Sequence, residues 1–142
     1  MKKTRLQFTD LAPYFPYGLL VRYKEGVHFG ICEISGLDLL GVKILGIDIW
    51  VLFTNLKPIL RPFSDLTNEI EINGKKFVAK NVLDETHISN WSYGNIKNVN
   101  SEMLKDAPFW FVEKLIEWQF DVFGLIDNGL AISIHDVEQA DA

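Results

Sequence analysis

The sequence predicts an α+β fold, in which a mainly antiparallel sheet packs against one long C-terminal helix on one face. Short apolar stretches separated by glycine turns occupy the first 80 residues and have the length of strands. Residues 106–123 instead repeat apolar side chains at helical spacing. Strands that come first, with a helix late in the chain, are typical of an α+β domain rather than of alternating βαβ units.

A short helical turn is expected near the start of the chain. Thr9 or Asp10 can cap it, because their side-chain oxygens accept hydrogen bonds from the free N–H groups of a first turn. Pro13 is tolerated only in that first turn, and Pro16 with Gly18 prevents a longer helix.

The apolar stretches that follow are interpreted as strands. Leu19–Tyr23 and Val27–Ile34 flank a tight turn, and Val42–Phe53 gives one long strand or two short ones around Gly46. Residues 49–53 lack polar alternation, which predicts burial on both faces of the sheet.

Two prolines mark the next segment, residues 56–66. Pro58 and Pro62 lack the N–H group that a helix interior or a strand ladder uses. We therefore exclude a central strand here and predict a crossing segment or a short helical turn.

The strongest hairpin signal in the chain is Asn73-Gly74. This dipeptide favours the positive φ angles of a type I′ turn. Glu69–Ile72 and Lys75–Ala79 should therefore pair, with Ile70 opposite Phe77.

The long helix is predicted to begin at Asp106, to hold Pro108 in its first turn and to end before Gly124. Its apolar side chains form two adjoining stripes, which is a wide surface for one small sheet to cover. This width predicts a homo-oligomer that assembles through the 106–123 helix.

The remaining elements complete one domain. Residues 84–100 are polar and predict a long loop, and Leu130–Ile134 predicts a last strand. We expect a single α+β domain over residues 1–142, with residues 1–8 and 136–142 as frayed ends.

Charge is unevenly distributed along the chain. Residues 1–80 hold eleven Lys and Arg against eight Asp and Glu, and residues 81–142 hold three against eleven. The acidic last third disfavours binding of duplex nucleic acid, although a basic groove in the first half stays open. A single cysteine, Cys32, and the lack of a long apolar run or signal-peptide pattern predict a cytoplasmic protein without membrane contact.

The sequence carries no catalytic, metal-binding or cofactor-binding signature. Neither phosphate-cradling glycine motif is present, the three histidines stand far apart, and no serine lies in a nucleophile elbow. We therefore expect no metal and no cofactor, and we expect binding rather than turnover.

Arg61 is the leading candidate for binding, because it stands between Leu60 and Pro62 in a rigid apolar segment. One interpretation is a structural ion pair with Asp65, one turn further along. The other is a guanidinium that grips a phosphate while aromatic rings stack on a base. The candidate ligand-binding residues in that case are Arg61, Tyr14, Tyr17, Arg22, Trp50 and Asp65.

Three segments resemble a family of small, uncharacterised proteins encoded by phages, prophages and mobile elements of Bacteroidota-type bacteria. The segments are LAPYFPYGL (residues 11–19), ILRPFSDL (59–66) and EWQFDVFGLI (117–126). Family members often carry histidine at the position of Gln119, so a catalytic role for that position does not transfer to this chain.

The resemblance implies action inside a bacterial host cell and no particular activity. Small phage proteins commonly act by binding, which leaves two hypotheses. The chain sequesters a small phosphorylated, nucleotide-type signal of host defence, or it binds a host defence protein or a phage replication or recombination protein as an accessory or inhibitor.

Overall fold

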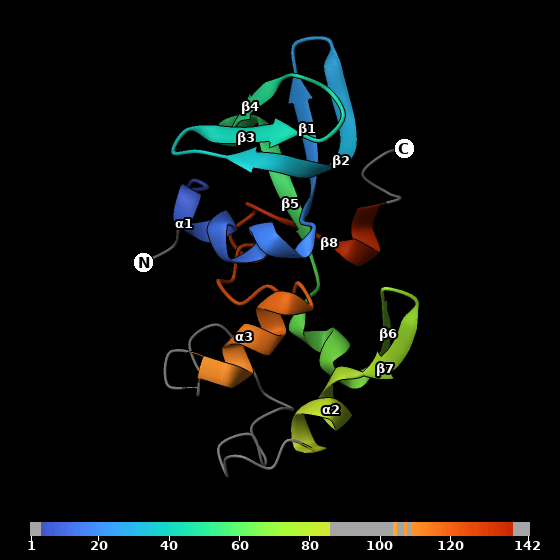
Figure 1. Ribbon diagram of the computed structural model, residues 1–142. Helices are drawn as coiled ribbons and strands as arrows, with labels where there is room; N and C mark the ends of the chain where they lie inside the picture. The colour runs from blue at the N-terminus through green and yellow to red at the C-terminus, as the bar shows by residue number, and fades with distance from the viewer. Residues whose placement is uncertain (1–3, 86–103, 105–106, 108, 138–142) are drawn as a thin grey trace. The chain divides into compact units, whose positions relative to one another are not determined.

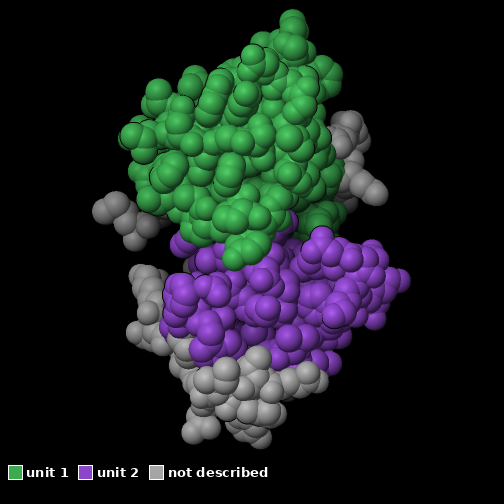
Figure 2. Space-filling model, viewed as in Figure 1, with its two compact units in different colours: residues 1–60, 125–142 green, residues 61–124 purple. Residues whose placement is uncertain are grey.

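The computed structural model describes residues 4–85, 104, 107 and 109–137. Its contacts divide the chain into two compact units, residues 1–60 with 125–142 and residues 61–124 (Figure 2). Most of the predicted loop 84–100 lies outside the described residues, as does the predicted start of the long helix at 106.

The first unit is built around a curled sheet (Figure 1). Its strands lie in the order β4-β3-β2-β1-β5-β8, and all neighbours are antiparallel except β5 and β8. The strands are β1 (Leu20–Glu25), β2 (His28–Leu37), β3 (Gly41–Ile44), β4 (Trp50–Leu52), β5 (Leu56–Leu60) and β8 (Ile132–Ser133). The expected mixture of helices with a mainly antiparallel sheet is confirmed.

Alternation explains β1: Val21 and Tyr23 are buried, whereas Arg22 and Lys24 point away from the core. The stretch 42–53 forms two strands, β3 and β4. Its predicted burial on both faces is wrong, because Trp50 and Leu52 in β4 are each about half exposed while Val51 between them is buried. The strand shows one buried face despite its uniformly apolar sequence.

The Glu25 carboxylate links the end of β1 to β4 and to the segment that follows β4. Glu25, at the end of β1, accepts a hydrogen bond from the side-chain amide of Asn55 at 2.6 Å and one from the backbone N–H of Leu52 at 3.4 Å. The second bond occupies an N–H on the outer edge of β4, a strand with no further neighbour in the sheet.

The start of the chain forms α1 (Phe8–Leu11) and a 3₁₀ segment, Ala12–Tyr17. Gln7 rather than Thr9 or Asp10 is the capping residue. Asp10 stands three positions later and accepts a hydrogen bond from the Gln7 N–H at 2.9 Å, which makes a capping box. Gly18, with φ 74°, ends the segment as the sequence indicates.

The exclusion of a central strand from residues 56–66 is wrong. Residues Leu56–Leu60 form β5, which lies between β1 and β8. Pro58 is tolerated because β8 is only two residues long and pairs with Ile59 and Leu60, so it does not reach the proline. The predicted short helical turn is present as the 3₁₀ segment Phe63–Thr67.

The second unit contains the predicted hairpin. Strands β6 (Glu69–Ile72) and β7 (Lys75–Val78) pair with Ile70 opposite Phe77, and the turn places Asn73 at φ 53° and Gly74 at φ 80°. The chain then enters α2 (Ala79–Glu85), and the ring of Phe77 lies 5.0 Å from that of Trp118.

The long C-terminal helix is wrong, because α3 spans only Phe109–Glu117. Gln119 adopts a left-handed φ of 64°, which ends helical geometry well before Gly124. The Gln119 carbonyl accepts a hydrogen bond from the Arg61 N–H at 2.8 Å, and the Asp121 N–H donates to the Arg61 carbonyl at 2.9 Å. Pairing with Arg61 thus takes up backbone groups that a longer helix would have used internally.

The apolar side chains of α3 differ in burial. Phe111 and Leu115 are fully buried, whereas Phe109 is exposed. The homo-oligomer stays a prediction, which light scattering of the purified chain tests. Within the described residues, no helix combines the length and the apolarity needed to cross a membrane.

Candidate functional site

Three cationic side chains gather on one side of the β1–β5 pair. Arg22 in β1 stands directly opposite Lys57 in β5, and opposite residues of antiparallel strands project to the same face about 5 Å apart. Lys24 follows two residues after Arg22, which places it on that face as well. On the other side of β1, Lys24 pairs with Phe29 of β2.

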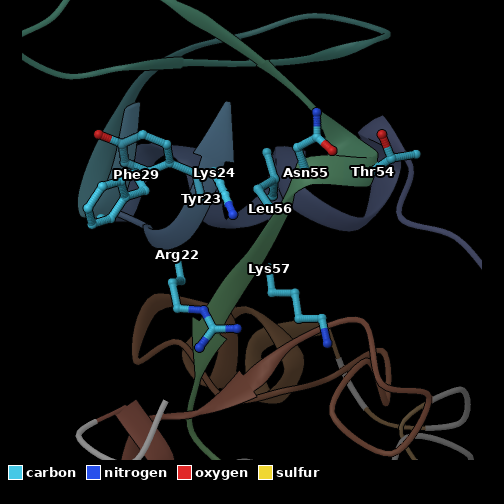
Figure 3. A pocket seen from close by; sticks show the side chains of 9 residues that line it. Arg22, Tyr23, Lys24, Phe29, Thr54, Asn55, Leu56 and Lys57 are labelled. Carbon is cyan, nitrogen blue, oxygen red and sulfur yellow. The ribbon is translucent and has the colours of Figure 1, made fainter. Parts of the chain in front are cut away.

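These residues line an open hollow of about 690 Å³ in the first unit (Figure 3). In that view, Arg22 and Lys57 extend in the same direction from neighbouring strands. The full lining is Arg22, Tyr23, Lys24, Phe29, Gly30, Thr54, Asn55, Leu56 and Lys57. No carboxylate is among them.

Two of the three cations of the hollow are exposed lysines. Neither Lys24 nor Lys57 forms an ion pair with any part of the chain that the structure describes. A bound anion could accept charge-assisted hydrogen bonds from both, so the arrangement favours a negatively charged ligand.

An exposed aromatic ring completes the hollow. Phe29 is 75% exposed, although a phenyl ring is normally among the more buried side chains of a domain. A ring of this kind next to cations can stack on a flat base while the cations hold phosphates.

The sequence-predicted residues are distributed over both units. Arg22 lines the hollow, and it is the only one of the six that does. Tyr14 is completely buried, so its ring offers no face to a ligand, whereas Tyr17 is partly exposed on the 3₁₀ segment. Trp50 lies on β4, where its ring covers Gly36 on the same row of the sheet.

Arg61 and Asp65 belong to the second unit. Arg61 is tied there by its backbone to Gln119 and Asp121, and its guanidinium donates to the Glu71 carbonyl at 3.3 Å. Burial lowers the pKa of the Arg61 guanidinium below its ordinary value, and the nearby Asp65 carboxylate acts in the opposite direction. These contacts give Arg61 structural partners in the second unit, while its ion pair with Asp65 and a ligand at Arg61 both stay predictions.

Lys24, Lys57 and Phe29 were missed from sequence. The predicted strand ended at Tyr23 and placed Lys24 in the turn, whereas β1 extends to Glu25 and therefore puts Arg22 and Lys24 on one face. Lys57 gave no signal, since its neighbour Pro58 argued against a strand. Phe29 was predicted only as part of the strand Val27–Ile34.

Among the described residues, no group of three or more His, Cys, Asp or Glu is placed to hold a metal ion. Comparisons of the chain with models of known protein families, with curated proteins and with solved structures found no match.

Proposed function

We propose that this chain is a non-enzymatic binding protein that captures a small phosphorylated, nucleotide-type ligand in the hollow between β1, β2 and β5. Under this proposal it acts by stoichiometric binding in a bacterial host, where a phage or prophage protein would sequester a defence signal. Its effect should then saturate at a fixed ratio of protein to ligand.

The observation that carries the proposal is the cationic lining of the hollow. Lys24 and Lys57 are exposed and form no ion pair within the described residues, and Arg22 lies beside them on the same face. No carboxylate is among the lining residues, so an anion can bind there without repulsion from the lining.

The side chains support distinct roles. Arg22 offers a planar guanidinium that can donate two parallel hydrogen bonds to one phosphate, and the lysines act as point charges. Phe29 offers its ring face to a base.

Calorimetry with cyclic and linear nucleotides tests the proposal, using wild-type chain, Lys57→Met and Lys43→Met. Lys43 is the matched control, because it is a lysine of the same sheet that pairs with Asp48 at 3.3 Å and does not line the hollow.

Lys57→Met should weaken binding at least about tenfold, near 1.4 kcal/mol, in keeping with the loss of a charge-assisted contact. It should leave the free energy of unfolding nearly unchanged, because Lys57 is exposed and forms no ion pair within the described residues. Lys43→Met should bind as wild type does. Equal binding by wild type and Lys57→Met would rule out the hollow.

A second candidate, binding of a host or phage protein, is favoured by a different observation. Another hollow of the first unit, about 520 Å³, is lined in part by Phe8, Leu39, Leu40 and Leu52. Leu39 and Leu40 are both more than two-thirds exposed, which is costly for an isolated chain. Stoichiometric recovery of one lysate protein by wild type and not by Leu40→Asp, with no nucleotide bound in calorimetry, would place this candidate ahead.

A further inference from the structure

The hollow has one exposed aromatic ring, which can stack on only one face of a base. Phe29 lies on β2 and keeps three-quarters of its area exposed. The only other aromatic residue lining the hollow, Tyr23, is itself buried in the core. A lone nucleotide stacked on Phe29 would therefore keep its second face in water, whereas small-molecule sites usually bury 70–90% of their ligand.

The cations are spread along the strands rather than focused on one point. Arg22 and Lys24 are two residues apart on β1, about 7 Å along the strand, and Lys57 adds a position on the neighbouring strand. Groups at this spacing can each contact a separate phosphate, as the successive phosphates of one polynucleotide strand would offer. Neighbouring bases of a strand would also cover the open face of the base on Phe29.

We infer that the nucleotide-type ligand of this hollow is a short single-stranded oligonucleotide, held by its backbone phosphates on Arg22, Lys24 and Lys57 and by one base on Phe29. The inference rests on the proposed function, because it uses the same side chains for the same phosphate and base chemistry. It adds that several consecutive nucleotides bind together. An exposed basic strand face with an aromatic side chain is a common arrangement for such ligands.

Fluorescence anisotropy with labelled thymidylate and uridylate oligomers tests this, comparing a dinucleotide, an oligomer of about eight nucleotides and a hairpin duplex. The oligomer of either sugar should bind at least about tenfold more tightly than the dinucleotide and the duplex. With three phosphates engaged, the logarithm of its binding constant should fall with the logarithm of salt concentration at a slope of about −2.

Variants separate the roles of the residues. Lys24→Met and Lys57→Met should each reduce the magnitude of that slope by about 0.7, and Lys43→Met should leave it unchanged. Phe29→Leu should weaken the oligomer about tenfold and keep the slope, because it removes stacking and no charge.

The alternative results have distinct meanings. A dinucleotide or a free nucleotide that binds as tightly as the oligomer, with loss of binding in Lys57→Met, overturns the single-strand inference and leaves the proposed capture of a small ligand standing. Equal binding of the duplex also overturns it. If no nucleotide of any length binds, the proposed function fails together with the inference.

Discussion

Replacing Arg61 by methionine distinguishes the two roles that its sequence context left open. Methionine keeps the length and apolar stem of the side chain and removes its charge and its hydrogen-bond donors. If Arg61 is structural, this change lowers stability without affecting a ligand.

The contacts of Arg61 set the size of the expected loss. Its hydrogen bond to the Glu71 carbonyl is long, at 3.3 Å, so a value near 1 kcal/mol is appropriate for this charged donor. The Asp65 carboxylate is 2% exposed and would lose a nearby positive charge. Because the guanidinium itself is partly solvated, we discount that interaction to about 1 kcal/mol. The free energy of unfolding should fall by about 2 kcal/mol, which lowers Tm by roughly 6 °C.

Urea unfolding followed by tryptophan fluorescence, together with nucleotide calorimetry at a temperature where the variant is folded, measures both quantities. Arg61→Met should be destabilised and should bind nucleotide as wild type does. Lys57→Met should keep the stability of wild type and should bind nucleotide more weakly. An Arg61→Met chain with unchanged stability and no nucleotide binding would refute this reasoning and restore Arg61 as the phosphate-binding residue.

Four further substitutions test the sheets and turns of the two units. Gly41→Ala should lower the free energy of unfolding in urea by about 3 kcal/mol, because the new Cβ would lie 2.1 Å from the backbone oxygen of Val51. Gly46→Ala is the control: it has open space around the new Cβ and a φ of 88°, and it should cost only about 1 kcal/mol. Equal losses in the two variants would contradict the clash at Gly41. Glu25→Ala should lower the free energy of unfolding by about 1–2 kcal/mol through loss of its two hydrogen bonds across the curl, and no loss would show that the curl does not depend on them. Asn73→Ala should cost about 1 kcal/mol by thermal unfolding, since alanine tolerates φ 53° less well than asparagine, and a stabilised variant would argue against the turn.

The sequence predicted those elements whose conformation depends on neighbouring residues in the chain. The Asn73-Gly74 turn fixed the register of its hairpin, because few other residues accept positive φ at both positions. The end of α3 could not be predicted in this way. It depends on Gln119 and Asp121 pairing with Arg61, which lies far away in sequence.

The candidate site was only partly predictable for the same reason. Arg22 was identified as a cation away from the tail, but its partner Lys57 joins it only through the pairing of β1 with β5. Pro58 argued against that pairing, because a proline fits a strand only where no neighbouring strand needs its N–H. Here β8 stops short of Pro58, and the length of β8 cannot be predicted from the residues around the proline.

The pairing of Arg61 with Phe120 also bears on how the chain tolerates changes of length. These residues lie near the two ends of the second unit, so the backbone that enters it is paired with the backbone that leaves it. An insertion or deletion between such paired ends does not alter the distance that the flanking chain must span. Changes of length between Arg61 and Phe120 should therefore leave the strands of the first unit connected as they are.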